Sequence, residues 1–516
     1  LCVVSTFDCT TDDFRAMVAD FEEEMQSCVS DWEIAVINDH KTCAMLNVTD
    51  MEAFQNIMTG TKMTEWANTQ VLRPDHGLPV IADMDVVVVG GGAAGVAAAE
   101  TVGRHGANVL LIERYGFCGG NAVAGMSGTV CGMFLASDSL KNEPTQVVFG
   151  FTERFRAAMD AAGGITKPLR YGKTWTVTHD PLVWREVADA FLIDANVRVL
   201  YHTLVVGVVM GDDEEIVGLV IEGKSGRAVV NSRQAIDSSG DADVVFRMGW
   251  GYSIGDEGRV QNPTMMFRLG NVDIDRYLDF WGPDTICSPE VSRMLIDANN
   301  SGKYNLPRAK IWLFPTPRPK ELLCNATRVM GRDGRDLYAA DTEDLTEAEF
   351  SGRQQVREYS RFLRDNIPGC GAAFVLDTGV QAGIRQSRSV LGRDRLLNAD
   401  VLDRRKRSDG VVRSPWPIEL HAGEKPKLEW LLDDYYEVPF GALVPERGKN
   451  LLVAGRCLSA EHEALASARV TAQCFGYGHA AGLTAVEALQ SGRQPAQLSG
   501  EEVRQLLNTD GARLDE

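Results

Sequence analysis

The chain has 516 residues and a formal charge of −20, from 52 Lys and Arg against 72 Asp and Glu. Its composition, 44% hydrophobic and 24% charged, is that of a globular protein and excludes wholesale disorder. The negative charge disfavours nucleic acids and anionic membranes, whose phosphates would repel it. The 11 cysteines form no CxxC pair, and neither a membrane span nor a basic leader is visible, so the sequence predicts a cytoplasmic protein.

Residues 1–75 predict a separate small α+β module, with 14 acidic and 4 basic residues. Apolar residues at helical spacing predict a helix over 14–28. Strand-like stretches follow over 33–37 and 42–48, and then a second helix around 54–58. The order strand–helix–strand–strand–helix indicates a ferredoxin-like αβ module, for which we expect packing or homo-oligomerisation rather than a second active site.

Residues 71–83 contain Pro and Gly and predict a linker, after which the pattern changes. The continuous apolar run Val86–Val89 is typical of a buried parallel strand, and a helix and a second strand, Asn108–Ile112, complete a βαβ unit. The turn between strand and helix reads Gly90-Gly91-Gly92-Ala93-Ala94-Gly95. Such a turn lets the backbone approach a pyrophosphate at the helix N-terminus, so the unit predicts dinucleotide binding.

The residue that ends the second strand, Glu113, indicates which dinucleotide is bound. Its carboxylate can accept hydrogen bonds from both ribose hydroxyls and would repel the 2′-phosphate of NADP. Beyond it come Gly119-Gly120-Asn121 and Gly125, a second glycine-rich loop that an NAD domain does not need.

Two further motifs follow in order along the chain. The strand Gln234–Asp237 runs into Ser238-Ser239-Gly240-Asp241-Ala242-Asp243, and the strand Leu451–Ala454 leads into Gly455-Arg456, with a helix after Arg469. On these three motifs the chain resembles the FAD-dependent oxidoreductases of the glutathione-reductase-like superfamily, in a branch near the fumarate-reductase-like flavoproteins. The resemblance covers residues 83–490. It implies an α/β fold with a Rossmann-like FAD-binding domain from residues 83–135, 175–250 and 441–490, and an inserted substrate domain, 250–440.

The resemblance also implies roles for single residues in binding FAD. The pyrophosphate would lie against the first glycine turn, the adenosine ribose against Glu113 and Arg114, and the adenine near Val205 or Val206. The helix after Arg469 would direct its N-terminus at the isoalloxazine and stabilise the anionic reduced flavin. The expected FAD-binding residues are Gly90, Gly92, Ala93, Ala94, Gly95, Glu113, Arg114, Gly119, Gly120, Asn121, Val205, Val206, Gly240, Asp241, Gly455 and Arg456.

The absence of two sequence patterns restricts the possible source and acceptor of the electrons. There is no second glycine-rich βαβ fingerprint for NAD(P)H and no CxxxxC after the first βα unit, as a disulfide reductase would need. We therefore expect electrons to come from a small-molecule substrate and to leave to oxygen, a quinone or a partner protein. Cys118 is expected to be a packed thiol rather than a redox group or a covalent flavin link.

His421 and Arg385 are the leading catalytic candidates, because they lie in stretches that resemble those lining the family's site above the flavin. A histidine can take a proton from an O–H or N–H while hydride passes to flavin N5. An arginine can anchor a carboxylate or stabilise negative charge. Tyr435 and Tyr436 are weaker candidates, and no metal is expected, since His462-Glu463 lacks the second His of a zinc motif.

The sequence thus predicts an FAD-dependent oxidase or dehydrogenase that transfers a hydride from a small organic substrate to flavin N5. One alternative is a flavin-dependent reductase of activated C=C bonds, with Arg385 as the proton donor. A monooxygenase is another, although it needs a way to accept NAD(P)H. A third is an FAD-bound scaffold without turnover that recruits a partner through residues 1–75.

Overall fold

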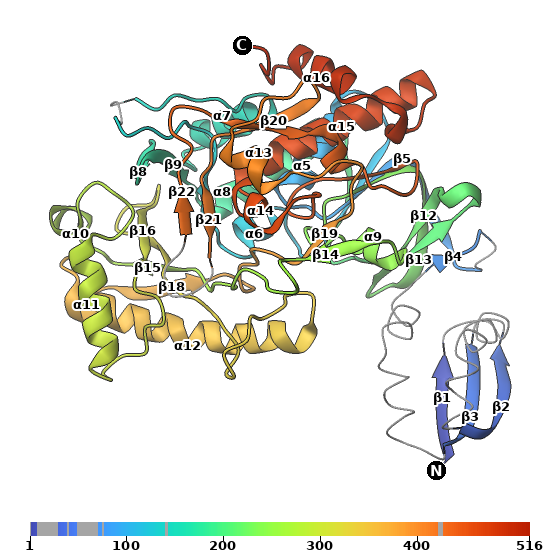
Figure 1. The fold of residues 1–516 in the computed structure, drawn as a ribbon, viewed down its shortest axis with the longest axis horizontal. Coiled ribbons are helices and arrows are strands. Elements are labelled where there is room, and N and C mark those ends of the chain that lie inside the picture. The colour runs from blue at the N-terminus through green and yellow to red at the C-terminus, as the bar shows by residue number, and fades with distance from the viewer. Residues whose placement is uncertain are drawn as a thin grey trace. The chain divides into compact units, whose positions relative to one another are not determined.

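The computed structural model of the chain (Figure 1) describes residues 2–7, 29–38, 41–48, 71–74, 77–139, 143–421 and 427–516. It contains two compact units, the larger formed by Leu72–Val245 and Trp250–Glu516. In the N-terminal unit, β1 (Cys2–Phe7), β2 (Val29–Asn38) and β3 (Lys41–Val48) form an antiparallel sheet of order β1-β3-β2. This confirms the strands predicted over 33–37 and 42–48. The helices predicted over 14–28 and around 54–58 lie outside the described residues.

The larger unit is built on a mixed sheet of order β10-β6-β5-β13-β12-β11-β4, with β24 also paired to β13. Strands β10, β6, β5, β13 and β24 run parallel, while β12 and β11 return antiparallel. The predicted α/β fold with parallel strands is therefore confirmed. The strand bounds are β4 Val71–Leu72, β5 Val80–Val89, β6 Val109–Ile112, β10 Arg198–Leu200, β11 Leu204–Met210, β12 Ile216–Gly223, β13 Gly226–Asp237 and β24 Leu451–Val453.

Strand β5 starts earlier than the sequence suggested, so the predicted linker 71–83 is wrong at its end. Val80 already pairs with Val229 of β13, and the Val229 N–H donates to the Pro79 carbonyl. Only the last four residues of β5, the Val86–Val89 run, are buried. The first half, residues 80–85, is exposed or only half-buried although four of its six residues are apolar, and its pairing with β13 defines it as a strand.

Helix α5 (Ala93–Arg104) connects β5 to β6 and packs closely on α15 (Thr471–Ser491). Small residues allow this approach, because a Cβ on Gly478 would come within 2.0 Å of the Ala94 carbonyl oxygen. The two helices bring the first glycine turn and the start of α15 to the same region of the unit. The remaining helices near this core are α6 Gly120–Val123, α7 Phe151–Ala161, α8 Pro181–Asp194, α9 Asp243–Arg247, α13 Asn398–Leu402, α14 His462–Ala468 and α16 Gly500–Thr509.

Residues from about 265 to 384 have a second hydrophobic core of their own. It lies around an antiparallel sheet of order β16-β17-β15-β18, and Figure 1 shows the long helix α12 along one side of that sheet. The bounds are β15 Phe267–Gly270, β16 Trp312–Pro315, β17 Leu322–Asn325, β18 Phe374–Thr378, α10 Ile274–Trp281, α11 Pro289–Asn300 and α12 Thr342–Asn366.

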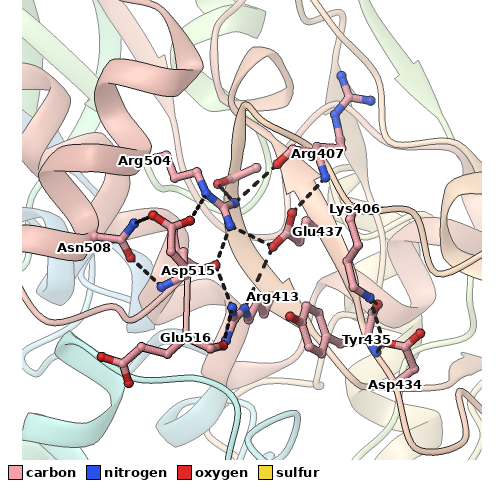
Figure 2. A network of polar contacts seen from close by, with 12 residues as sticks. Lys406, Arg407, Arg413, Asp434, Tyr435, Glu437, Arg504, Asn508, Asp515 and Glu516 are labelled. Carbon is pink, nitrogen blue, oxygen red and sulfur yellow. Dashed lines mark hydrogen bonds and ion pairs between the residues drawn. The ribbon is translucent and has the colours of Figure 1, made fainter.

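Several short strands complete the unit. One pair, β20 and β23, is held by a polar network (Figure 2). Glu437 on β23 accepts a hydrogen bond from Arg504 of α16 at 3.2 Å, and Arg413 on β20 donates to the Leu514 carbonyl at 2.6 Å. The network anchors the segment that runs on from β20 to His421. The short strands are β7 Thr129–Val130, β8 Leu169–Tyr171, β9 Thr174–Thr178, β14 Tyr252–Ile254, β19 Arg388–Val390, β20 Gly410–Ser414, β21 Ile418–Leu420, β22 Lys427–Glu429 and β23 Tyr436–Pro439.

Among the helices that the structure describes, none combines the length and apolar character needed to cross a membrane.

Candidate functional site

A continuous cavity opens at the carboxyl ends of the parallel strands β5, β6 and β13, where α/β sheets commonly bind ligands. Its walls come from both the mixed sheet and the segment with the second core. Most of the residues expected from the sequence line it: Gly90, Gly92, Ala93, Ala94, Glu113, Arg114, Gly119, Gly120, Asn121, Val205, Gly240, Asp241, Arg385, His421, Gly455 and Arg456. Gly95 and Val206 are not among the lining residues.

The first glycine turn presents bare backbone to the cavity. A Cβ on Gly92 would meet nothing closer than 3.8 Å, whereas one on Gly95 would come within 1.8 Å of the Gly90 carbonyl oxygen. Gly95 therefore serves helix–strand packing, beneath the lining. Helix α5 begins without a side-chain cap and without an acidic residue in its first turn. Its free N–H groups and dipole favour an anion at this end of the cavity.

Glu113 is 4% exposed and lies against the same turn. Its Oε2 accepts from the Gly91 N–H at 2.6 Å and its Oε1 from the Tyr115 N–H at 2.8 Å. Burial raises the pKa of Glu113, although these two hydrogen bonds act in the opposite direction. Next to it, Arg114 donates to Gln381 Oε1 at 2.6 Å, which joins the end of β6 to the segment after β18.

Asp241 of the second motif and Arg456 of the third motif contact each other in the wall of the cavity. The Arg456 guanidinium lies 2.8 Å from Asp241 Oδ1 and also donates to the Ser387 hydroxyl, which donates to the same carboxylate at 2.6 Å. Burial opposes ionisation, but Arg456 and Ser387 outweigh it and hold the pKa of Asp241 below its usual value. This charge pair is therefore complete without a ligand.

Strand β11 and the start of α15 complete this half of the cavity. Val205 lines it, while Val206 packs against a separate apolar cluster with Val209, because neighbouring side chains of a strand point to opposite faces. Helix α15 begins at Thr471 without a side-chain cap, and Thr471 lines the cavity. The expected helix after Arg469 thus directs its N-terminus into the cavity.

His421 lies at the other end, directly after β21, and its ring Nε2 is 3.4 Å from Glu419 Oε1. The same oxygen accepts a hydrogen bond from the Tyr171 hydroxyl at 2.8 Å. Burial and the positive charge of Arg385 hold the pKa of His421 well below its ordinary value, although Glu419 raises it. At neutral pH the imidazole is therefore uncharged. Burial opposes ionisation of Glu419, but hydrogen bonds from His421 and Tyr171 and the charge of Arg469 outweigh it and lower its pKa, so Glu419 is ionised.

Arg385 is 5% exposed, and the acceptors that it meets among the described residues are neutral oxygens. It donates to the Asn262 carbonyl at 2.6 Å and lies 3.5 Å from Asn325 Oδ1. The Asn262 N–H in turn donates to the His421 carbonyl at 3.2 Å, so Asn262 holds both catalytic candidates in place. Burial and the charges of Arg308 and Arg469 hold the pKa of Arg385 well below its ordinary value.

Four residues of this end were not singled out as site residues from the sequence. Tyr171 comes from β8 and Arg308 from the loop before β16, and neither belongs to a motif. Glu419 lies two residues before His421, a spacing that places both on one side of an extended segment and could have suggested the pair. Arg469 was noted only as the residue before a helix. The structure brings them together from segments far apart in the chain.

Other sequence candidates lie outside the cavity. The Tyr436 hydroxyl is buried and donates to the Ser467 hydroxyl at 2.9 Å. The Lys406 ammonium lies over the Tyr435 ring, 3.8 Å from its centroid. Cys118 is fully buried behind Gly91 and does not line the cavity. No cluster of three or more His, Cys, Asp or Glu side chains suited to a metal occurs within the described ranges.

Residues 85–507 match the sequence model of the family described as FAD dependent oxidoreductase. A 65-residue stretch is 42% identical to urocanate reductase of Eggerthella lenta; it is 13% of this chain, and the chain covers 11% of that relative's length. A geranylgeranyl bacteriochlorophyll reductase-like protein of Thermoplasma acidophilum is similar in structure, with a TM-score of 0.45, 14% identity and coverage of 84% and 85% of the two chains. A flavin-dependent brominase gives a TM-score of 0.42 at 15% identity, with 83% of each chain covered.

Proposed function

The chain belongs to the family of FAD-dependent oxidoreductases, and from that premise we propose that it oxidises a small organic substrate at the His421 end of the cavity. The observation that carries this proposal is the continuity of the cavity. One end is lined by the glycine turn and the Asp241–Arg456 pair, and the other by a buried histidine and arginine. The segment from 250 to 440, proposed as the substrate domain, supplies both of those catalytic candidates.

The lining residues fit FAD by their chemistry. Backbone N–H groups at the start of α5 suit the pyrophosphate, and Gly92, which lines the cavity there, has no side chain to obstruct it. Glu113 has acceptor capacity for ribose hydroxyls, and the uncapped start of α15 suits a group that becomes negative on reduction. When bound, FAD supplies an acceptor for a hydride, which no side chain of the protein can supply.

His421 would act as the proton acceptor. Because Glu419 faces Nε2, we assign the ring proton to Nε2, which leaves the lone pair on Nδ1 free to take a proton from a substrate O–H or N–H. The Tyr171 hydroxyl orients Glu419, and Glu419 orients the ring and stabilises the cation that forms. Arg385 would hold the substrate and balance negative charge that develops on it.

The test is anaerobic mixing of the FAD-loaded protein with a panel of small alcohols, amines and organic acids. We expect at least one compound to bleach the flavin bands without NAD(P)H. With that compound, His421→Asn should slow bleaching about 100-fold or more, the usual contribution of a general base. His462→Asn is the matched control, since His462 does not line the cavity. Unchanged bleaching in His421→Asn, or reduction by NAD(P)H alone, contradicts the proposal.

A second candidate, reduction of an activated C=C bond, is favoured by the environment of Arg385. Its buried guanidinium has two other guanidiniums beside it, which lower its pKa and make release of a proton to a substrate carbon less costly. Chemically reduced protein distinguishes the two directions. Rapid anaerobic reoxidation by an unsaturated acid, lost in Arg385→Gln, supports the reductase, and absence of reoxidation excludes it.

A further inference from the structure

The His421 end of the cavity has more positive charge than its walls balance. Arg385 and Arg469 line it and Arg308 lies directly behind Arg385. The hydrogen-bond acceptors of all three are neutral: the Asn262 and Thr327 carbonyls and the side-chain oxygens of Asn325 and Gln261. No ion pair joins any of the three to a described residue within ion-pair distance, and His421 is neutral. Three guanidinium groups therefore face one carboxylate, Glu419.

The hydrogen-bonding groups at this end also lack acceptors. Five buried donor atoms in its walls, or packed directly behind them, meet no acceptor among the described residues: Arg308 Nη2, Arg469 Nε, Trp416 Nε1, Trp312 Nε1 and Gln261 Nε2. Trp416 lines the cavity and is 1% exposed. Buried donors are normally paired, so these atoms, which have almost no accessible surface, add to the excess of donors over acceptors in the walls around this end.

Among the described residues Glu419 forms no ion pair with these arginines, and its Oε1 is shared between Tyr171 and His421. Asn325 Oδ1 is likewise shared, at 2.9 Å from Arg308 and 3.5 Å from Arg385. That arrangement holds two like charges next to each other. Such a pair is stabilised when an anion joins it.

The rest of this end is aromatic. Tyr171, Phe314 and Trp416 line it, with ring centroids 6.1 Å apart for Tyr171–Phe314 and 5.1 Å for Tyr171–Trp416. The first two rings are nearly parallel, at 20°. Such walls pack best against a flat, unsaturated body.

We propose that the substrate of this site is an aromatic or conjugated carboxylate, whose oxyanion accepts hydrogen bonds from Arg385 while its flat body packs against Tyr171, Phe314 and Trp416. Calling this ligand the substrate rests on the proposed function, but the predicted binding does not require turnover. The FAD pyrophosphate is the other source of oxyanions in this cavity. In the FAD-loaded protein that group is already bound, so anion binding there is separate from it.

The test is calorimetric titration of the FAD-loaded protein with benzoate, benzamide and cyclohexanecarboxylate. Benzamide removes the charge and keeps the ring, while cyclohexanecarboxylate keeps the charge and removes the flatness. We expect benzoate to bind about 10-fold or more tightly than benzamide, and more tightly than cyclohexanecarboxylate. Absence of benzoate binding, equal affinity for benzamide, or release of FAD on binding overturns the proposal.

Variants locate the anion. Arg385→Gln should weaken benzoate binding about 10-fold or more and leave benzamide binding little changed. Arg328→Gln is the matched control, because Arg328 also has buried donors without a described partner yet does not line the cavity. An equal loss in both variants, or none in Arg385→Gln, contradicts the assignment.

If benzoate binds in this way but no compound bleaches the flavin, the proposed function fails and the inference stands. If a substrate bleaches it but benzoate and benzamide bind alike, only the inference fails.

Discussion

The two ends of the cavity differ in how their charges are balanced. At the glycine-turn end, Asp241 has Arg456 and Ser387, and both oxygens of Glu113 accept backbone N–H groups. At the His421 end, the partners of Arg385 in the described part of the chain are neutral. Both ends are buried, so the difference does not come from solvent. At one end the charged side chains are paired before a ligand arrives, and at the other the charge balance depends on a ligand.

This difference has an energetic consequence. A buried donor without an acceptor costs about 1–3 kcal/mol, and a buried charge without a counter-charge costs more. The protein tolerates these costs at the His421 end, where an anion bound to Arg385 balances the excess positive charge. At the glycine-turn end the charged side chains are paired, and the free N–H groups at the start of α5 are left for the ligand's anion.

The largest expected effect comes from removing one charge from each end. Arg456→Met leaves Asp241 buried without its counter-charge and should lower the free energy of unfolding by about 3–5 kcal/mol, together with loss of bound FAD. Arg385→Met removes a charge that has no counter-charge, and should leave the stability of the substrate-free protein unchanged or higher. Thermal unfolding and flavin absorbance measure both. If the two variants lower the free energy of unfolding equally, the proposed difference in charge balance between the two ends is contradicted.

A smaller effect is expected from Gly95→Ala, which tests whether the glycine-turn end depends on close backbone packing. The new Cβ would lie 1.8 Å from the Gly90 carbonyl oxygen, so the turn must move, at a cost of about 3 kcal/mol and with weaker FAD binding. Gly371→Ala is the matched control, since a Cβ there meets nothing within 4 Å. Denaturant unfolding and FAD titration check the pair. FAD affinity that stays the same in Gly95→Ala would refute this account of the turn.

The smallest effect concerns the pH dependence of substrate oxidation. Because the pKa of His421 is held well below its ordinary value of about 6.5, acidification from about pH 7.5 to 6 should leave its lone pair free and the bleaching rate nearly constant. In Arg385→Met a positive neighbour is gone, so the pKa of His421 should rise although burial still lowers it, and any fall of the rate with acid should begin at a higher pH than in the wild type. Stopped-flow traces across pH give both profiles. A wild-type profile with an inflection near 6.5 would show that His421 is not shielded in this way.

The glycine-turn end could be predicted from the sequence because its signals are local. The Val86–Val89 run, the glycines that follow and the acidic residue at the end of the next strand lie close together in the chain. The N-terminal half of β5 could not be predicted in this way, since pairing with β13 defines it. Val205 and Val206 could not be separated either, because the choice between them depends on which face of β11 meets the cavity.

The His421 end was only partly accessible from the sequence. His421 and Arg385 were found through a resemblance, whereas Arg308 and Tyr171 come from segments that carry no motif. What defines this end is an imbalance of charge and of donors, which exists only once distant segments are packed together. A property of this kind has no local sequence pattern.

The most direct test of the two-ended cavity is a visible-absorption titration of the FAD-loaded protein with benzoate. If the oxyanion site and the cofactor share one cavity, saturating benzoate should shift the flavin bands with the affinity that calorimetry gives, and Arg385→Gln should weaken both signals equally. Benzoate that binds by calorimetry without changing the flavin bands would place the anion elsewhere and contradict the account.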